Sequence, residues 1–272
     1  MKLAFSTLAC PDWTLSQILS IASSERYDGI ELRFIENEDS LWKLPAFRGS
    51  ELARTKQTIA DSGISICCVD TSCRFHFPDA AERERWLEEG VRMGDLASAL
   101  GAPGIRVFGD KIQPGADRAS TRRWIAESIH VLSERIGTTG VEVWLETHGD
   151  FASSFETNGI MASVASNNAG VIWDPANCLI DFGERPQEGA VAMKASIRHV
   201  HIKDLRQGRD GWEPVLTGEG TFPLAELKLS LEQINFQGFV SFEWEKKWHL
   251  QIPDASIALP HFSRWYRENW LR

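Results

Sequence analysis

Two common nucleotide-binding motifs are missing from this sequence. Neither GxGxxG nor GxxxxGK[ST] occurs in its 272 residues, which removes the strongest sequence signals for dinucleotide and nucleoside triphosphate binding. The five cysteines include no CxxC pair, so a zinc ribbon is not indicated. No stretch approaches the roughly 18 continuous apolar residues that a transmembrane helix needs. We therefore expect a cytoplasmic protein that does not enter membranes.

The sequence also has fewer basic residues than acidic ones. The chain has 29 Lys and Arg against 38 Asp and Glu, a net charge of −9. Such a chain has no electrostatic attraction for nucleic acid or for anionic lipid. Hydrophobic residues make up 43% and charged residues 25%, as in ordinary soluble proteins. A small-molecule substrate is therefore expected, and exposed aromatic residues are compatible with a homo-oligomer.

Short β-rich segments alternate with longer helical segments along the whole chain. The predicted strands are Lys2–Leu8, Gly29–Phe34, Ile64–Thr71, Ile105–Gly109, Val141–His148, Gly170–Asp174, Ile197–Asp204 and Phe239–Glu245. The predicted helices are 14–26, 48–62, 80–100, 117–137, 157–167, 186–196, 223–235 and 254–270, with starts visible at Thr14, Asp79 and Pro223. Eight such repeats predict a single parallel eight-stranded (β/α)8 TIM barrel over residues 1–272. An open doubly wound sheet would favour fewer strands and a Gly-rich phosphate loop.

Ionisable residues stand at the C-terminal ends of four consecutive predicted strands, where a buried parallel strand should be apolar. Barrel active sites are assembled at this end. Three carboxylates gathered there would repel one another unless a cation neutralised them. One divalent ion is therefore expected, and the donor set suits Mn²⁺, Mg²⁺ or Co²⁺, with Zn²⁺ as an alternative. The expected ligands are Glu146, Asp174, His201 and Glu243.

The alternation of side chains along a strand helps to choose among neighbouring candidate metal ligands. In HVHIKD, His199, His201 and Lys203 share one face, because side chains repeat with a period of two. His201 is nearer the rim and is the expected ligand, whereas His199 is expected to point inward without binding the ion. Glu243 and Glu245 also share a face, so the choice of Glu243 as ligand is an assumption.

These residues give the chain a resemblance to a known superfamily. GIELRF (29–34), LETHGDF (145–151), WDPANC (173–178), RHVHIKDLR (198–206), GEG (218–220) and FVSFEWEKKW (240–248) resemble the xylose-isomerase-like TIM-barrel superfamily, in particular its sugar phosphate isomerase/epimerase branch. The resemblance covers essentially the whole chain and implies the same four metal ligands. It implies a metal-dependent isomerase or epimerase of a sugar or keto-polyol. Relatives also include inosose and dehydroshikimate dehydratases and enzymes that split glycosides.

The chain departs from the ketose 3-epimerase pattern at two positions. A substrate-binding His of those enzymes corresponds here to Asn177, and a second Glu corresponds to Ala152. Asn177 is still expected to contact substrate. His148, two residues after Glu146, is similar to the base of some lyase-type relatives. The alternative reaction is therefore an elimination, such as dehydration or 3-keto-glycoside cleavage.

The chemistry that the superfamily shares is proton abstraction next to a carbonyl, through an enediolate. His148 or Glu243 is the expected base, and Lys203 is expected to bind substrate oxygen or to stabilise negative charge. Structural alternatives are a hydrogen bond from His148 to Asp150 and a salt bridge from Lys203 to Asp174 or Asp204. Further expected substrate contacts are Arg33, Arg106 and Trp244.

Two other classes of function remain as alternatives. An endonuclease IV-like DNA repair enzyme shares the barrel, but it needs a trinuclear zinc site and a basic groove, whereas this chain has seven histidines and a charge of −9. A metal-free structural or regulatory barrel is the other alternative. The four ligand types, all in register at strand ends, argue against it.

Overall fold

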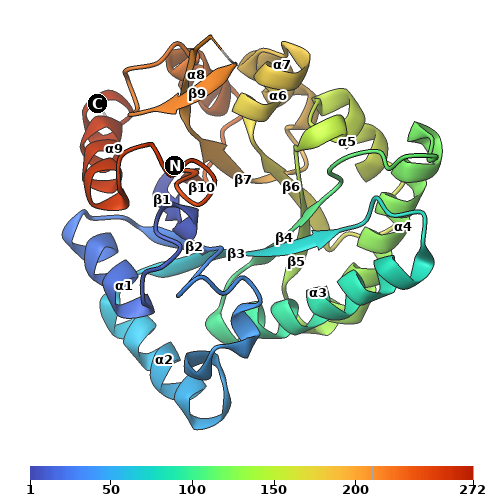
Figure 1. Ribbon diagram of the computed structural model, residues 1–272, viewed down its shortest axis with the longest axis horizontal. Helices are drawn as coiled ribbons and strands as arrows, with labels where there is room; N and C mark the ends of the chain where they lie inside the picture. Colours follow the sequence, from blue (N-terminus) through green and yellow to red (C-terminus); the bar gives the residue numbers. More distant parts are fainter. Residues whose placement is uncertain (210, 272) are drawn as a thin grey trace. The chain divides into compact units, whose positions relative to one another are not determined.

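The computed structural model describes residues 1–209 and 211–271. Within these residues, eight parallel strands form one closed barrel (Figure 1), and hydrogen-bonded neighbours follow the order β1, β10, β7, β6, β5, β4, β3, β2. The predicted (β/α)8 barrel is thus confirmed. By its internal contacts the chain divides into unit 1, which is Met1–Cys67 with Val200–Arg272, and unit 2, which is Cys68–His199.

The barrel strands are β1 (Lys2–Ser6), β2 (Gly29–Leu32), β3 (Ser65–Arg74), β4 (Gly104–Phe108), β5 (Glu142–Glu146), β6 (Ala169–Trp173), β7 (Ile197–Ile202) and β10 (Phe239–Phe242). The helices are α1 (Leu15–Ser24), α2 (Gly49–Ser62), α3 (Ala80–Leu100), α4 (Arg118–Ile136), α5 (Ser154–Met161), α6 (Pro175–Phe182), α7 (Pro186–Met193), α8 (Leu224–Gln233) and α9 (Ala255–Asn269). A separate antiparallel pair consists of β8 (Asp204–Gln207) and β9 (Trp212–Val215). None of the described helices is both long and apolar enough to cross a membrane.

In unit 1, α9 packs against β1 and β10 (Figure 1). The ring of Phe242 on β10 stacks on Phe262 of α9, with centroids 4.2 Å apart. The hydroxyl of Tyr27, which precedes β2, donates to the carbonyl of Leu259 at 2.8 Å. These contacts hold α9 against β10 and against the segment that precedes β2.

In unit 2, α3 and α4 lie side by side (Figure 1). Glycines on α3 permit the close approach. A Cβ added at Gly90 would lie 2.8 Å from Leu132, and one at Gly94 would lie 2.9 Å from Ile136. Both distances are shorter than ordinary contact between carbon atoms. The two helices flank β4 and β5, which carry part of the predicted site.

The predicted helix starts are found in the structure, and several elements differ from the prediction. Thr14 and Asp79 cap α1 and α3 with their side chains, and Pro223 is the residue before α8. The helix predicted at 157–167 begins earlier, because Ser153 caps α5 by accepting from the amide of Glu156. Neither α6 nor the β8–β9 pair was predicted. Both follow a barrel strand almost directly, where a longer loop was expected.

Candidate metal centre and active site

In unit 1, His201 on β7 lies between two carboxylates. Its Nε2 is 3.1 Å from Oε2 of Glu31, and its Nδ1 is 3.5 Å from Oε1 of Glu243. All three side chains are buried. A carboxylate that holds one imidazole nitrogen orients the ring and raises the basicity of the other nitrogen, as is common for metal-binding histidines. Glu31 is not among the residues predicted from the sequence, and the signal for it was a charged residue inside the buried strand β2.

The ammonium group of Lys203 lies between two further carboxylate oxygens of unit 1. It donates to Glu243 at 2.7 Å and to Glu245 at 2.6 Å. Burial raises the pKa of Glu245, but the Lys203 charge and a hydrogen bond from His249 outweigh burial and lower this pKa below its usual value. The same hydrogen bond raises the pKa of His249. Lys203 therefore helps to keep Glu245 ionised and also forms an ion pair with Glu243.

Asp204, one predicted partner of Lys203, instead organises the loop that carries the GEG motif. Its carboxylate accepts hydrogen bonds from the amides of Leu205, Gly218, Gly220 and Phe222, at 2.7–3.3 Å. A Cβ at Gly220 would lie only 2.1 Å from Oδ1 of Asp204. The glycine is therefore required by the close approach of the backbone to this carboxylate.

In unit 2, the ligand candidate Glu146 forms an ion pair with Arg106. Nη1 of Arg106 donates to Oε2 of Glu146 at 2.9 Å and lies 3.4 Å from Oδ2 of Asp70. Nη2 donates to the carbonyl of Thr71 at 3.2 Å. The guanidinium is buried and also lies over the ring of Phe108. Arg106, predicted as a substrate contact, thus fixes Glu146 at the end of β5.

Asp174 ends β6 and starts α6. Its Oδ1 accepts from the amides of Ala176 and Asn177, so that Oδ2 is the oxygen that the helix cap does not use. The backbone amide of Asp174 donates to the hydroxyl of Thr147 at 2.7 Å. The side chain of Asn177, predicted to contact substrate, donates to the carbonyl of Thr147 at 3.1 Å. These bonds lock the ends of β5 and β6 together.

His148 lies at the rim beyond β5, with 40% of its side chain exposed. Its Nδ1 is 3.3 Å from Oδ1 of Asp110 in the loop after β4. The carboxylate of Asp150, the predicted alternative partner, accepts instead from the amide of Ile112 at 2.8 Å. Gly149, at φ +61°, turns the chain directly after His148. A Cβ there would lie 2.6 Å from the carbonyl oxygen of Asp110.

The remaining predicted residues are placed as follows. Arg33 is buried, with its guanidinium 3.7 Å from Asp39 and over the ring of Phe34. Trp244 is fully buried, and its Nε1 donates to the carbonyl of Pro253. It therefore has no exposed surface for a substrate. His199 is buried and stacks on Trp144, with centroids 6.1 Å apart.

Comparisons with known proteins agree with this arrangement. The sequence profile of the family described as xylose isomerase-like TIM barrel matches residues 19–266. The chain belongs to the xylose isomerase-like TIM barrel family. The resemblance expected from the motifs is thereby confirmed, and family membership supports a sugar-modifying enzyme. No curated protein matches the sequence.

Several solved structures of this kind share the fold of the chain. An L-ribulose 3-epimerase has a TM-score of 0.82 at 16% identity, covering 99% of this chain and 94% of that one. The IolI protein with a binding zinc atom has a TM-score of 0.81 at 18% identity, covering 100% of both chains. A probable 3-DHS dehydratase, AsbF from Bacillus anthracis, has a TM-score of 0.79 at 18% identity, covering 97% and 98%. At these identities the similarity establishes the fold of this xylose isomerase-like protein.

Proposed function

We propose that this protein is a divalent-metal-dependent isomerase or epimerase of a sugar-like keto-polyol, acting by proton abstraction next to a carbonyl. One observation carries the proposal: three carboxylates and one imidazole, all buried, stand at the C-terminal ends of β5, β6, β7 and β10, and these groups are typical ligands of a divalent ion. The ion would be Mn²⁺, Mg²⁺ or Co²⁺, with Zn²⁺ as an alternative. The proposed ligands are Glu146, Asp174, His201 and Glu243.

The surroundings of these side chains fit a cation. Glu31 holds one nitrogen of His201, as the partner of a metal-binding histidine does. The helix cap holds Asp174 through one of its oxygens, which fixes the position of this carboxylate after β6. Carboxylates buried this deeply are costly unless a cation or hydrogen bonds compensate them. Arg106 and Lys203 supply part of that compensation, and a divalent ion would supply the rest.

The protein's own residues would then carry the proton transfer. A bound divalent ion polarises a substrate carbonyl as a Lewis acid. His148 stands two residues beyond Glu146, about 3.3 Å per residue along an extended chain, and its ring is partly exposed. With Nδ1 facing Asp110, Nε2 is the nitrogen that takes the α-proton. Lys203, which forms an ion pair with Glu243, is the proposed proton donor for a substrate oxygen.

Elimination is the second candidate, and two positions favour it. Asn177 and Ala152 replace the second His and Glu of the ketose 3-epimerase pattern. In the structure the Asn177 amide bonds a backbone carbonyl, and the carbonyl of buried Ala152 accepts from the Cys178 thiol. Because Asn177 and Ala152 both form structural contacts, His148 remains as the proposed base, as in the lyase-type relatives.

Metal analysis tests the ligand set. We expect the wild type to bind one divalent ion per chain, and Glu146→Gln, Asp174→Asn and His201→Ala to bind it much more weakly. Glu142→Gln, at the opposite end of β5, is the matched control and should bind as the wild type. Full metal occupancy in the three variants would show the ligand assignment to be wrong.

A screen of keto-sugars in D₂O, followed by NMR, separates the two reactions. An isomerase or epimerase gives a product of the same composition that carries deuterium. A dehydratase gives a product lighter by one water, and glycoside cleavage gives two fragments. Absence of any turnover by the metal-loaded protein across ketoses, keto-inositols and 3-keto-glycosides would contradict the proposed function.

A further inference from the structure

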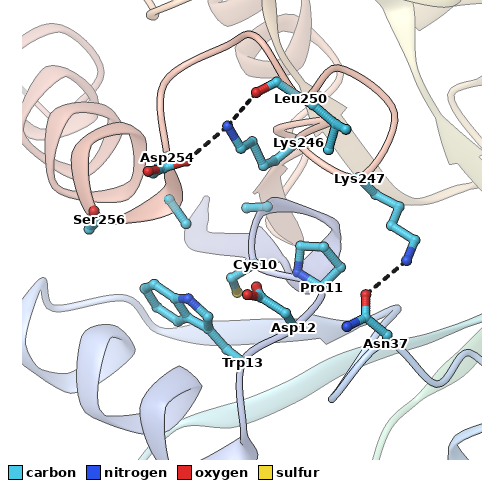
Figure 2. A pocket seen from close by; sticks show the side chains of 12 residues that line it. Cys10, Pro11, Asp12, Trp13, Asn37, Lys246, Lys247, Leu250, Asp254 and Ser256 are labelled. Carbon is cyan, nitrogen blue, oxygen red and sulfur yellow. Dashed lines mark hydrogen bonds and ion pairs between the residues drawn. The ribbon is translucent and has the colours of Figure 1, made fainter.

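Unit 1 contains a cavity of about 620 Å³ beside the ends of β1 and β10 (Figure 2). Its volume lies within the roughly 300–1,000 Å³ that is typical of small-molecule sites. Its walls come from the loop after β1, from Asn37 after β2, and from the segment between β10 and α9. Of the ligand set, neither His201 nor Glu243 lines it. Lys246, which does, follows Glu243 by three residues, so the cavity and this proposed ligand share the segment after β10.

A tight turn builds one wall of the cavity. Ile35 and Glu38 exchange backbone hydrogen bonds, and the two residues between them, Glu36 and Asn37, both have positive φ, at 52° and 64°. This backbone is unfavourable for Glu36, which has a Cβ. The amide of Asn37 donates to the carbonyl of Pro11 at 2.7 Å. Strain held in place by the surrounding structure is typical of binding sites, and here it presents the Asn37 side chain to the cavity.

The second wall is held by Lys246. Its ammonium donates to the carbonyls of Leu250 and Ile252 at 2.8 and 2.7 Å and lies 2.8 Å from Asp254. Figure 2 shows Lys246 turned toward Leu250 and Asp254. The loop that leads from β10 to α9 is therefore closed around the half-buried ammonium group of Lys246. A wall that is already ordered costs little further conformational entropy when a ligand binds.

The charges of the side chains that line the cavity sum to zero. Asp12 and Asp254 contribute two carboxylates, and Lys246 and Lys247 contribute two ammonium groups. Lys246 is already engaged, and Lys247 donates to Asn37 at 2.9 Å. No excess positive charge is left to attract a phosphate or carboxylate group. The ligand that fits this cavity is therefore electrically neutral.

The remaining lining points to a sugar ring. The half-buried indole of Trp13 offers an aromatic surface, and Pro11 and Leu250 add apolar area. Asp12, Asn37 and Ser256 offer hydrogen-bond acceptors and donors around it (Figure 2). An apolar platform edged by a few polar groups suits the C–H face and hydroxyls of a carbohydrate.

We infer that this cavity binds a second, non-reacting neutral sugar ring, so that the substrate is a glycoside or disaccharide. The inference rests on the proposed function, which places the reacting carbons at the proposed ligand set. Trp13 stacks on the second ring, while Asp12 and Asn37 bind its hydroxyls. Binding energy from this ring is available to position the reacting ring.

Calorimetric titration of the metal-loaded protein tests the inference, with glucose, glucose 6-phosphate, cellobiose and maltose as probes. We expect at least one disaccharide to bind about tenfold more tightly than glucose, the gain of one good additional contact. Glucose 6-phosphate should bind no more tightly than glucose. Trp13→Ala should remove the advantage in affinity that the disaccharide has over glucose. Trp124→Ala, on α4 in unit 2, is the matched control and should bind as the wild type.

Asp12→Ala, at an exposed position, provides a second test should Trp13→Ala fold poorly, and should also weaken disaccharide binding. The inference is overturned if neither disaccharide binds more tightly than glucose, or if glucose 6-phosphate binds most tightly of the four probes. It is also overturned if the higher affinity for the disaccharide persists in Trp13→Ala or Asp12→Ala. Metal content and turnover of single-ring keto-sugars report on the proposed function separately. If the protein binds metal and converts single-ring keto-sugars but does not prefer disaccharides, the proposed function stands and the second subsite is wrong.

Discussion

Nδ1 of His148 lies 3.3 Å from Oδ1 of Asp110, and the two residues come from loops after neighbouring strands. Asp110 itself has a left-handed backbone, at φ +58°, and its carbonyl accepts from the amide of Asp150. Burial raises the pKa of Asp110, but His148, Arg74 and His76 outweigh burial and lower it. Asp110 is therefore an ionised group that fixes the orientation and tautomer of the proposed base.

Asp110→Asn tests this pairing. The amide preserves the shape of the side chain but removes its charge, so we expect kcat to fall about 10- to 100-fold, as when the partner of a functional histidine is removed. Metal content and KM should change little, because Asp110 holds no ligand. Asp95→Asn, on the exposed face of α3, should have the activity of the wild type. An unchanged kcat in Asp110→Asn would remove this residue from the mechanism.

Glu31→Gln should weaken metal binding without removing a ligand. Loss of the carboxylate leaves His201 poorly oriented and less basic, and we expect the affinity for the ion to fall about 10- to 100-fold. Competition with a chelator measures the change. Glu38→Gln, in the turn that follows β2, should bind metal as the wild type. Equal affinity in Glu31→Gln would mean that His201 is oriented by other contacts.

Lys203→Met should destabilise the metal-free protein. Glu243 would remain buried beside the half-buried Glu245 without their shared cation, and breaking a buried pair such as Lys203–Glu243 costs about 3–5 kcal/mol. Urea unfolding of the metal-free protein measures the loss. The double variant Lys203→Met/Glu245→Gln removes one of the two stranded charges and should recover a large part of it. A single variant as stable as the wild type would contradict this account.

His76 should make the stability of the fold depend on pH. Burial lowers its pKa below the usual 6.5, with Arg74 acting in the same direction and Asp110 and a hydrogen bond to Gly109 opposing it. The folded protein then binds this proton more weakly than the unfolded chain does. The contribution to stability is complete above about pH 6.5 and is lost as pH falls through the lowered folded pKa.

The measurement compares the free energy of unfolding at neutral pH with its value below the unfolded pKa of His76. In His76→Gln we expect a smaller drop between the two conditions than in the wild type. His261→Gln, on α9, is the control and should keep the full drop. An identical drop in His76→Gln and the wild type would place the pH dependence elsewhere.

The barrel could be predicted from the sequence because its periodicity is local. The predicted helix at 80–100 coincides with α3, since Asp79 caps its start and Gly101 ends it in a left-handed conformation. The short helix α6 was missed because a single turn signal, Asp174–Pro175, looks the same in a loop. The β8–β9 pair was missed because its polar residues give no alternation of apolar side chains.

The sequence predicted site residues only where an ionisable residue stands in or at the end of an otherwise apolar strand. Glu146 and Asp174 stand at strand ends, and the structure places both there, buried. The partner of each functional group comes from a distant part of the chain. Glu31 reaches His201 across 170 positions, and the residue facing His148 was not its neighbour Asp150. Such pairs depend on tertiary packing, which no local pattern encodes.

The carboxylate of Asp204 draws together the amides of residues 205, 218, 220 and 222. The β8–β9 pair therefore belongs to a loop whose two ends are held together by the carboxylate of Asp204. Lengthening such a loop costs only about 0.6 kcal/mol for each doubling of its length. The chain can thus acquire longer insertions here, such as a lid or an oligomer contact, without moving His201 or Lys203.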